Sequence, residues 1–146
     1  MVILVAIGGD TDERPVIETA NDLATTYNVP LMAMHVIPEE DSGAHIEEMR
    51  SLPGMDNYSI DQQESSAERV AEQMVRNSIG APAEAKFVGR VGSPAEEILS
   101  VASELDPRFV VIGGRKRSPT GKALFGSVTQ SVLLQSERPV VTVLSE

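Results

Sequence analysis

A basic segment stands out in an otherwise acidic sequence. The formal net charge is -10, yet residues 115–122 hold four of the twelve Lys and Arg residues, and residues 107–136 contain no Asp or Glu. Glycines precede this run, and Gly126-Ser127 follow it, where a helix is expected to begin. Basic side chains and the amides of a helix start both attract phosphate. The candidate nucleotide-binding residues in this segment are Gly113, Arg115, Lys116, Gly126, Ser127, Val128 and Thr129.

Simpler explanations exist for each part of the segment. Ser127 can be an ordinary N-cap, with Gln130 three residues on to complete a capping box. The basic run can be a solvated loop that carries no ligand. We prefer an anion site, because one hypothesis then accounts for both the acid-free segment and the Gly126-Ser127 pair.

A second candidate stretch, Gly8-Gly9-Asp10-Thr11-Asp12, follows the first apolar run. Paired glycines let the backbone turn sharply and let a ligand approach closely. Two interpretations stay open. The stretch is either a turn whose Asp or Thr caps the next helix, or one wall of a nucleotide site.

The other chemistry-bearing residues form no catalytic or metal constellation. His35 is expected to be a satisfied strand-end imidazole rather than a general base. His45, beside Glu47 and Glu48, is too isolated for a metal site. The sequence has no evident Ser-His-Asp or paired-carboxylate pattern, so we predict no catalytic residues and favour a binding module over an enzyme. The absence of Cys excludes disulfides and thiolate metal ligands.

Short apolar runs alternate with amphipathic stretches and must position these residues. This alternation predicts an α/β fold, a parallel sheet with helices on both faces. The expected strands are Val2–Ile7, Pro30–Ile37, Ala83–Val88, Phe109–Ile112 and Pro139–Leu144. The expected helices are Val16–Tyr27, about Ile60–Ile79, Pro94–Leu105 and Ser127–Ser136. Such sheets bind ligands where the strand order reverses, so function is expected in the loops after the first, second and fourth strands.

Length and composition indicate one domain over residues 1–146. A chain of 146 residues with 41% hydrophobic and 3% aromatic residues can form one aliphatic core. The connection from Glu39 to Tyr58 is long and acidic and contains Gly43, Pro53 and Gly54. We expect it to be a mobile segment or lid, whose role the sequence leaves open.

Charge and hydropathy disfavour several partners and compartments. An isoelectric point near 4.6 argues against binding to nucleic acid or anionic membranes. The longest apolar run, Met1 to Ile7, is too short to span a membrane and lacks the basic start of a signal peptide. A cytoplasmic protein is therefore expected, and the scarcity of aromatic residues also disfavours RNA.

Four segments are similar to one known family. The most specific is FVVIGGRKRSPTGKALFGSVTQSVLLQSERPVVTV, residues 109–143, with Gly, two residues, Gly, nine residues, then Gly and Ser or Thr as its hallmark spacing. ILVAIGGD, MHVIPE and VGSPAEEIL support it. On these segments, nearly the whole chain resembles the universal stress protein family.

The resemblance implies a single Rossmann-like domain whose five parallel strands lie in the order 3-2-1-4-5. It also implies a homodimer, for which the apolar edge Pro139 to Leu144 is the expected interface. In one branch of the family the hallmark loop holds ATP, so the implied ligand is ATP or another adenine nucleotide, with magnesium undecided.

Several positions match the nucleotide site of that branch. Gly113 matches the first hallmark glycine, and Gly126 with Ser127 match the pair that meets phosphates. Val36 matches the position whose backbone pairs with adenine, and Ile7 matches the apolar wall.

Two positions depart from the family pattern. Lys116 stands at the second hallmark glycine, where it either fills the phosphate space or reaches the phosphates with its ammonium group. Gly8 stands where the family has an Asp that contacts the adenosine. Loss of that partner weakens binding by about 1–3 kcal/mol.

The leading hypothesis is a stress-response protein that binds an ATP-like nucleotide or another phosphorylated ligand. One alternative is a dimeric protein-interaction module that binds no nucleotide and docks its basic loop on an acidic surface. The other is a weak nucleotide hydrolase, because Gly8 to Asp12 resembles the SGGxDS loop of ATP pyrophosphatases, although Ile7 stands at the position of the first Ser.

Overall fold

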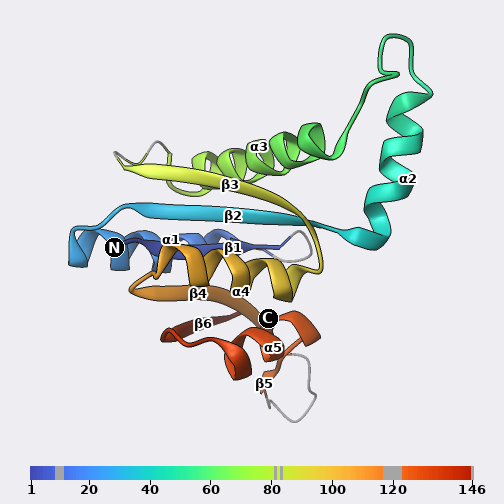
Figure 1. The fold of residues 1–146 in the computed structure, drawn as a ribbon. Coiled ribbons are helices and arrows are strands. Elements are labelled where there is room, and N and C mark those ends of the chain that lie inside the picture. The colour runs from blue at the N-terminus through green and yellow to red at the C-terminus, as the bar shows by residue number, and fades with distance from the viewer. Residues whose placement is uncertain (9–11, 81, 83, 117–122, 146) are drawn as a thin grey trace.

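The computed structural model describes residues 1–8, 12–80, 82, 84–116 and 123–145. The strands are β1 (Ile3–Ile7), β2 (Leu31–Pro38), β3 (Ala85–Gly92), β4 (Phe109–Lys116), β5 (Ala123–Leu124) and β6 (Val140–Ser145). The helices are α1 (Arg14–Tyr27), α2 (Glu39–Arg50), α3 (Ile60–Ile79), α4 (Pro94–Leu105) and α5 (Ser127–Gln135). Strands and helices alternate along most of the chain, so the predicted α/β class is confirmed (Figure 1).

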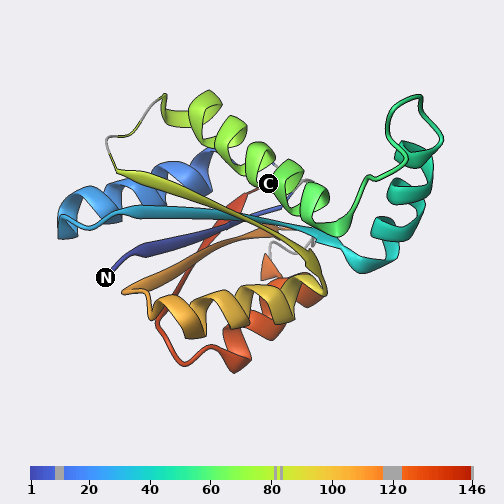
Figure 2. The same cartoon turned by 45° about the horizontal axis from the view of Figure 1, so that its top comes forward.

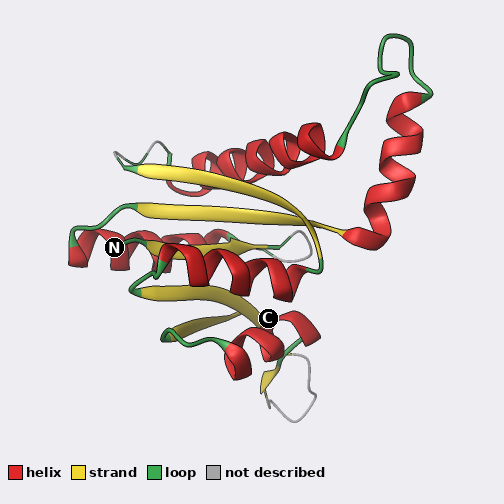
Figure 3. Cartoon of the chain, viewed as in Figure 1, coloured by secondary structure: helices red, strands yellow, loops and turns green. Residues whose placement is uncertain are grey.

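The parallel strands lie in the order β3-β2-β1-β4-β6. This order is the predicted 3-2-1-4-5, with β6 as the fifth parallel strand. The two-residue β5 adds an antiparallel pair to the end of β4, which the sequence did not predict. β4 also runs four residues past its predicted end, because β6 pairs with it as far as Arg115 and β5 pairs with Lys116. Figure 3 shows the parallel strands as the central layer.

Helices cover both faces of this sheet, as predicted (Figure 2). On one face, Ile3, Val5 and Ile7 of β1 share a buried core with α1 and α3. On the other, Leu4 and Ala6 share a second core with α4 and α5. This division follows from the two-residue repeat of a strand, which turns alternate side chains to opposite faces. In the described ranges, none of the helices has both the length and the apolar character that crossing a membrane requires.

The acidic connection after β2 contains a helix where the sequence suggested a mobile segment. Residues 39–50 form α2, which stands out from the body beyond the end of β2 (Figure 1). Buried Ser42 donates its hydroxyl to Oε1 of Gln63 at 2.5 Å, and Nε2 of Gln63 donates to the carbonyl oxygen of Ser42 at 3.1 Å. These bonds join α2 to α3. Three acidic residues in the first turn, Glu39, Glu40 and Asp41, also suit the positive end of a helix.

Candidate functional site

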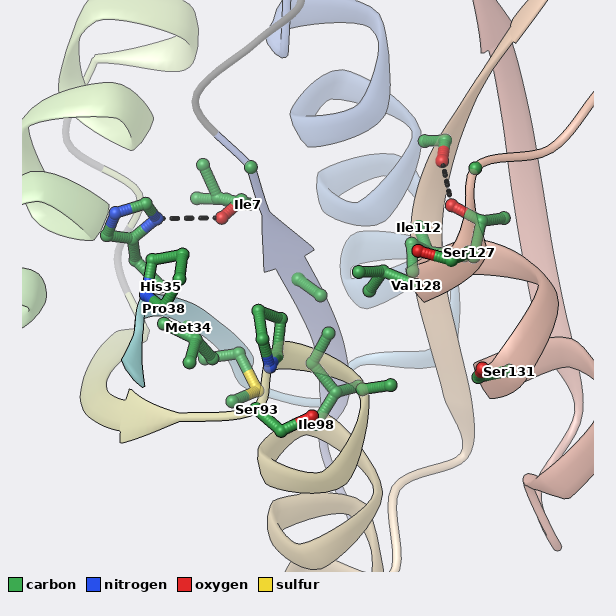
Figure 4. Close-up of a pocket in the computed structure, with 18 of the residues that line it drawn as sticks. Ile7, Met34, His35, Pro38, Ser93, Ile98, Ile112, Ser127, Val128 and Ser131 are labelled. Atoms are coloured by element: carbon green, nitrogen blue, oxygen red, sulfur yellow. Dashed lines mark hydrogen bonds between the residues drawn. The ribbon is translucent and has the colours of Figure 1, made fainter. Parts of the chain in front are cut away.

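The carboxyl ends of β1, β2 and β4 open onto one cavity of about 810 Å³. β1 has β2 on one side and β4 on the other, so the cavity lies where the strand order reverses. The first turns of α2, α4 and α5 complete its walls. Figure 4 shows the side chains that α4 and α5 contribute, with those from the strand ends. Small-molecule sites commonly have volumes of roughly 300–1,000 Å³, so the space suits a ligand of nucleotide size.

Most of the predicted site residues meet at this cavity. Eight of the ten line it: Ile7, Gly8, Val36, Gly113, Gly126, Ser127, Val128 and Thr129. The other two, Arg115 and Lys116, lie in the part of β4 that pairs with β5. Residues 117–122 of the basic segment and residues 9–11 of the first turn lie outside the described residues.

The first turn of α5 forms one wall of the cavity. Gly126 is the N-cap residue and Ser127 the first helical residue, so the alternative of Ser127 as N-cap was wrong by one position. Among the described residues, no side chain caps this helix start. The first hydrogen bond within the turn runs from Gln130 N to Gly126 O, which leaves the amides of residues 127–129 without a partner inside the helix. These amides are suited to bind an anion.

Gly113 and Gly126 both belong to this wall, but different constraints favour glycine at the two positions. A Cβ atom at Gly113 would lie 3.1 Å from Cγ2 of Val16, so close packing on α1 disfavours a side chain there. A Cβ atom at Gly126 would meet no atom of the described structure within 4 Å. Packing of the described residues therefore does not explain Gly126, whereas close approach of a ligand would.

The opposite wall, at the ends of β1 and β2, is mainly apolar. Ile7 and Val36 are buried there, and Met34, Ile98 and Ile112 also line the cavity. Nδ1 of His35 donates a hydrogen bond to the carbonyl oxygen of Ile7 at 2.9 Å (Figure 4). The expectation that His35 is a satisfied strand-end imidazole is confirmed.

Sequence reasoning missed the acidic side chains of the cavity. Glu13, just before α1, is only 8% exposed, and its Oε1 accepts a hydrogen bond from the Gly8 amide at 3.2 Å. No local pattern marks this residue, because its burial depends on how α1 packs against the sheet. Glu39, Glu40 and Asp41 line the rim on the α2 side.

The α2 side and the α5 side of the cavity therefore differ in charge. Three of its carboxylates, those of Glu39, Glu40 and Asp41, lie on the α2 side, beyond the end of β2. The fourth, that of Glu13, lies next to Gly8 at the end of β1, and the open amides of α5 lie beyond the end of β4. A phosphate is favoured near α5 and disfavoured near α2. Within the described part of the chain, no group of three or more His, Cys, Asp or Glu residues is arranged to hold a metal ion.

Curated relatives with a stress-protein name match the chain. A universal stress protein of Mycolicibacterium smegmatis is 46% identical over 48 residues, which is 33% of this chain and 37% of that protein. The stress response protein NhaX of Bacillus subtilis is 26% identical over 97% of this chain and 96% of its own length.

Solved structures share the fold over nearly the whole chain. A universal stress protein from Archaeoglobus fulgidus is 29% identical, covers 97% of both chains and has a TM-score of 0.62. An Archaeoglobus fulgidus family member in complex with dAMP is 24% identical, with a TM-score of 0.56 and coverage of 97% of this chain and 96% of that one. A universal stress protein in complex with cAMP is 19% identical, with a TM-score of 0.62 and coverage of 100% and 98%.

The sequence profile of the family described as "Universal stress protein family" matches residues 1–143. Because this match spans almost the whole chain, the protein belongs to the universal stress protein family.

Proposed function

We propose that the chain binds an adenine nucleotide in the cavity, with the phosphate at the first turn of α5. The observation that carries this proposal is the open helix start facing a cavity of about 810 Å³ at the switch point of the sheet. Amides at such a position bind phosphate through hydrogen bonds and through the positive end of the helix dipole. Arg115 and Lys116 add positive charge to the same end of β4 in this proposal.

Gly126 supports a ligand at this wall. Its backbone has a φ of -65°, which any residue can adopt, and its Cβ position is clear of the described residues. Glycine is therefore required neither by backbone conformation nor by packing against them. A phosphate bound at the amides of residues 127–129 would lie close to this Cβ position and would need the space.

The rest of the cavity supports the orientation of the nucleotide. The carboxylates of Glu39, Glu40 and Asp41 disfavour phosphate on the α2 side. The apolar surface of Ile7 and Val36 suits the faces of a purine. We therefore propose that the base lies at the ends of β1 and β2 and that the phosphate lies beyond β4.

Related structures support the choice of an adenine nucleotide. Two family members with the same fold have been solved in complex with dAMP and with cAMP. Both ligands combine an adenine base with a single phosphate group, and AMP is the corresponding probe for this chain. Micromolar or weaker affinity is expected, because the site has Gly8 where the family has an Asp.

Native mass spectrometry of the freshly purified protein tests this function. We expect bound mass that dissociates as an adenine nucleotide, and we expect titration with AMP, ATP and cAMP to give saturable binding. Discrimination against GTP should be poor, because Gly8 stands where the family has an Asp. Absence of binding by all three adenine nucleotides would refute the proposal and favour the alternative of a protein-interaction module. Conversion of bound ATP to ADP would instead support the hydrolase alternative.

We also propose that two copies of the chain pair along β6. β6 is an edge strand of the parallel sheet. Leu144 and Phe125 pack over Gly114, whose Cβ position is 2.9 Å from Cδ2 of Leu144 and 3.1 Å from Cδ1 of Phe125, and both side chains remain exposed. A second copy would cover this apolar pair and the unpaired strand edge.

A further inference from the structure

We propose that Glu13 recognises the sugar of the bound nucleotide, with its carboxylate accepting a hydrogen bond from a ribose hydroxyl. This inference rests on the proposed function, because it assigns a role within the same cavity. It adds a residue that selects ribose over deoxygenated sugars.

The carboxylate of Glu13 lies beside two strand ends. Oε1 of Glu13 accepts the Gly8 amide at 3.2 Å and lies 3.2 Å from the Cβ position of Gly8. Oε2 lies 3.9 Å from the Cβ position of Gly113. The carboxylate therefore lies between the ends of β1 and β4. Both neighbouring positions are glycine, so no side chain of theirs separates it from the cavity.

This position adjoins the proposed phosphate wall. The carbonyl oxygen of Gly113 accepts the hydroxyl of Thr129 at 2.8 Å, which brings the first turn of α5 next to the same glycine. On the other side of Glu13, Gly8 directly follows Ile7, the last residue of β1. Ile7 belongs to the apolar wall and lies beside His35. In a nucleotide, the sugar joins the phosphate to the base. A ligand that spans these two walls would bring its sugar to Glu13.

The chemistry of a buried carboxylate favours a hydroxyl as its partner. Glu13 is 8% exposed and lines the cavity. An ionised carboxylate only accepts hydrogen bonds and has about four acceptor positions, so it can bind more than one donor at the same time. It repels phosphate, whereas a sugar hydroxyl supplies a neutral donor. A hydrogen bond to a charged group in a poorly solvated site is stronger than one in water.

The test compares AMP with 2′,3′-dideoxy-AMP by isothermal titration calorimetry. The two ligands share base and phosphate and differ only in the hydroxyl groups. For the wild-type chain we expect AMP to bind about tenfold tighter, the size expected from one hydrogen bond to a charged group. The panel also includes dAMP, which keeps the 3′ hydroxyl, and cAMP, whose only free sugar hydroxyl is at the 2′ position.

Variants of Glu13 test whether its carboxylate recognises the sugar hydroxyl groups, and a folding control accompanies them. Glu13→Leu should bring the ratio of the two dissociation constants close to one, and Glu13→Gln should reduce it, because the neutral amide is a weaker acceptor. Glu18→Gln is the matched control, since Glu18 is exposed on α1, the helix that follows Glu13, and should keep the tenfold ratio. If Glu13→Leu does not fold, as judged by circular dichroism, the result for Glu13→Gln decides.

The outcomes distinguish this inference from the proposed function. Binding of both ligands by the wild type with equal affinity, or an unchanged ratio in the Glu13 variants, would overturn the role of Glu13 while leaving nucleotide binding intact. Failure of the wild type to bind AMP, ATP or cAMP would overturn both. A restored ratio in the double variant Gly8→Asp with Glu13→Leu would add support, because it returns a carboxylate to the neighbouring position.

Discussion

Thr129 donates its hydroxyl to the carbonyl oxygen of Gly113 at 2.8 Å, and this bond fastens the first turn of α5 to β4. Thr129 is buried, so water competes little for the bond. The fold itself thus positions the helix start that faces the cavity. The hydroxyl of Thr129 is used for this purpose, and the backbone amides of the turn are the groups proposed to meet the phosphate.

Replacement of Thr129 by Val tests this attachment. The variant keeps the shape of the side chain but leaves the Gly113 carbonyl without its hydroxyl partner, so the free energy of unfolding should fall by about 1–2 kcal/mol. Urea unfolding measures the change. AMP binding should weaken as well, because the turn is less firmly held. Thr129→Ser keeps the hydroxyl and is the control; an equal loss in both variants would argue against a role for the bond.

α3 packs closely against β3 at Gly89, so we expect any side chain at this position to cause a large loss of stability. A Cβ atom there would collide with the carbonyl oxygen of Glu64 and lie 2.5 Å from the backbone nitrogen of Glu68. Gly89→Ala should lower the free energy of unfolding by about 3 kcal/mol, at the upper end of overpacking effects.

Gly43→Ala is the control for Gly89→Ala. Gly43 lies in α2, and its Cβ position meets no described atom within 4 Å. Alanine is the better helix former, so this change should raise stability by about 0.5–1 kcal/mol. Thermal unfolding of both variants checks the pair, and similar melting temperatures would contradict the geometry.

The proposed dimer predicts that Leu144→Glu yields monomers. The substitution places a charge on the exposed apolar edge formed with Phe125, where pairing would bury it without a partner. Val141 and Val143 are less suitable positions because both pack against the core shared with α1. Sedimentation velocity at micromolar concentration measures the association. Leu134→Glu, at an exposed position on α5, should leave it unchanged, and a monomeric wild type would refute the proposal.

Much of the framework could be predicted because its signals are local. The amphipathic stretches of the sequence predict the observed bounds of α3 and α4, Ile60–Ile79 and Pro94–Leu105. The strand order came from the family resemblance. The convergence of Gly8, Val36 and Gly126 on one cavity follows from the rule that parallel strands bind ligands at their carboxyl ends.

The missed features depend on contacts between distant residues. α2 contains Gly43 and many acidic residues, so its local propensity is poor, and its bonds to α3 run through Ser42 and Gln63, which are 21 residues apart. The burial of Glu13 also depends on contacts that the local sequence does not reveal. A glutamate at a helix start is ordinarily exposed, and only the packing of α1 against β1 and β4 buries it.

The most direct test of nucleotide binding at α5 is calorimetric titration of AMP into the wild type and Gly126→Val. Valine at position 126 would occupy space that the described protein leaves open, so unfolding by urea should change by less than about 0.5 kcal/mol. The account predicts saturable AMP binding to the wild type and at least a tenfold weaker affinity for the variant. Equal affinities in two equally stable proteins, or no AMP binding by the wild type, would contradict it.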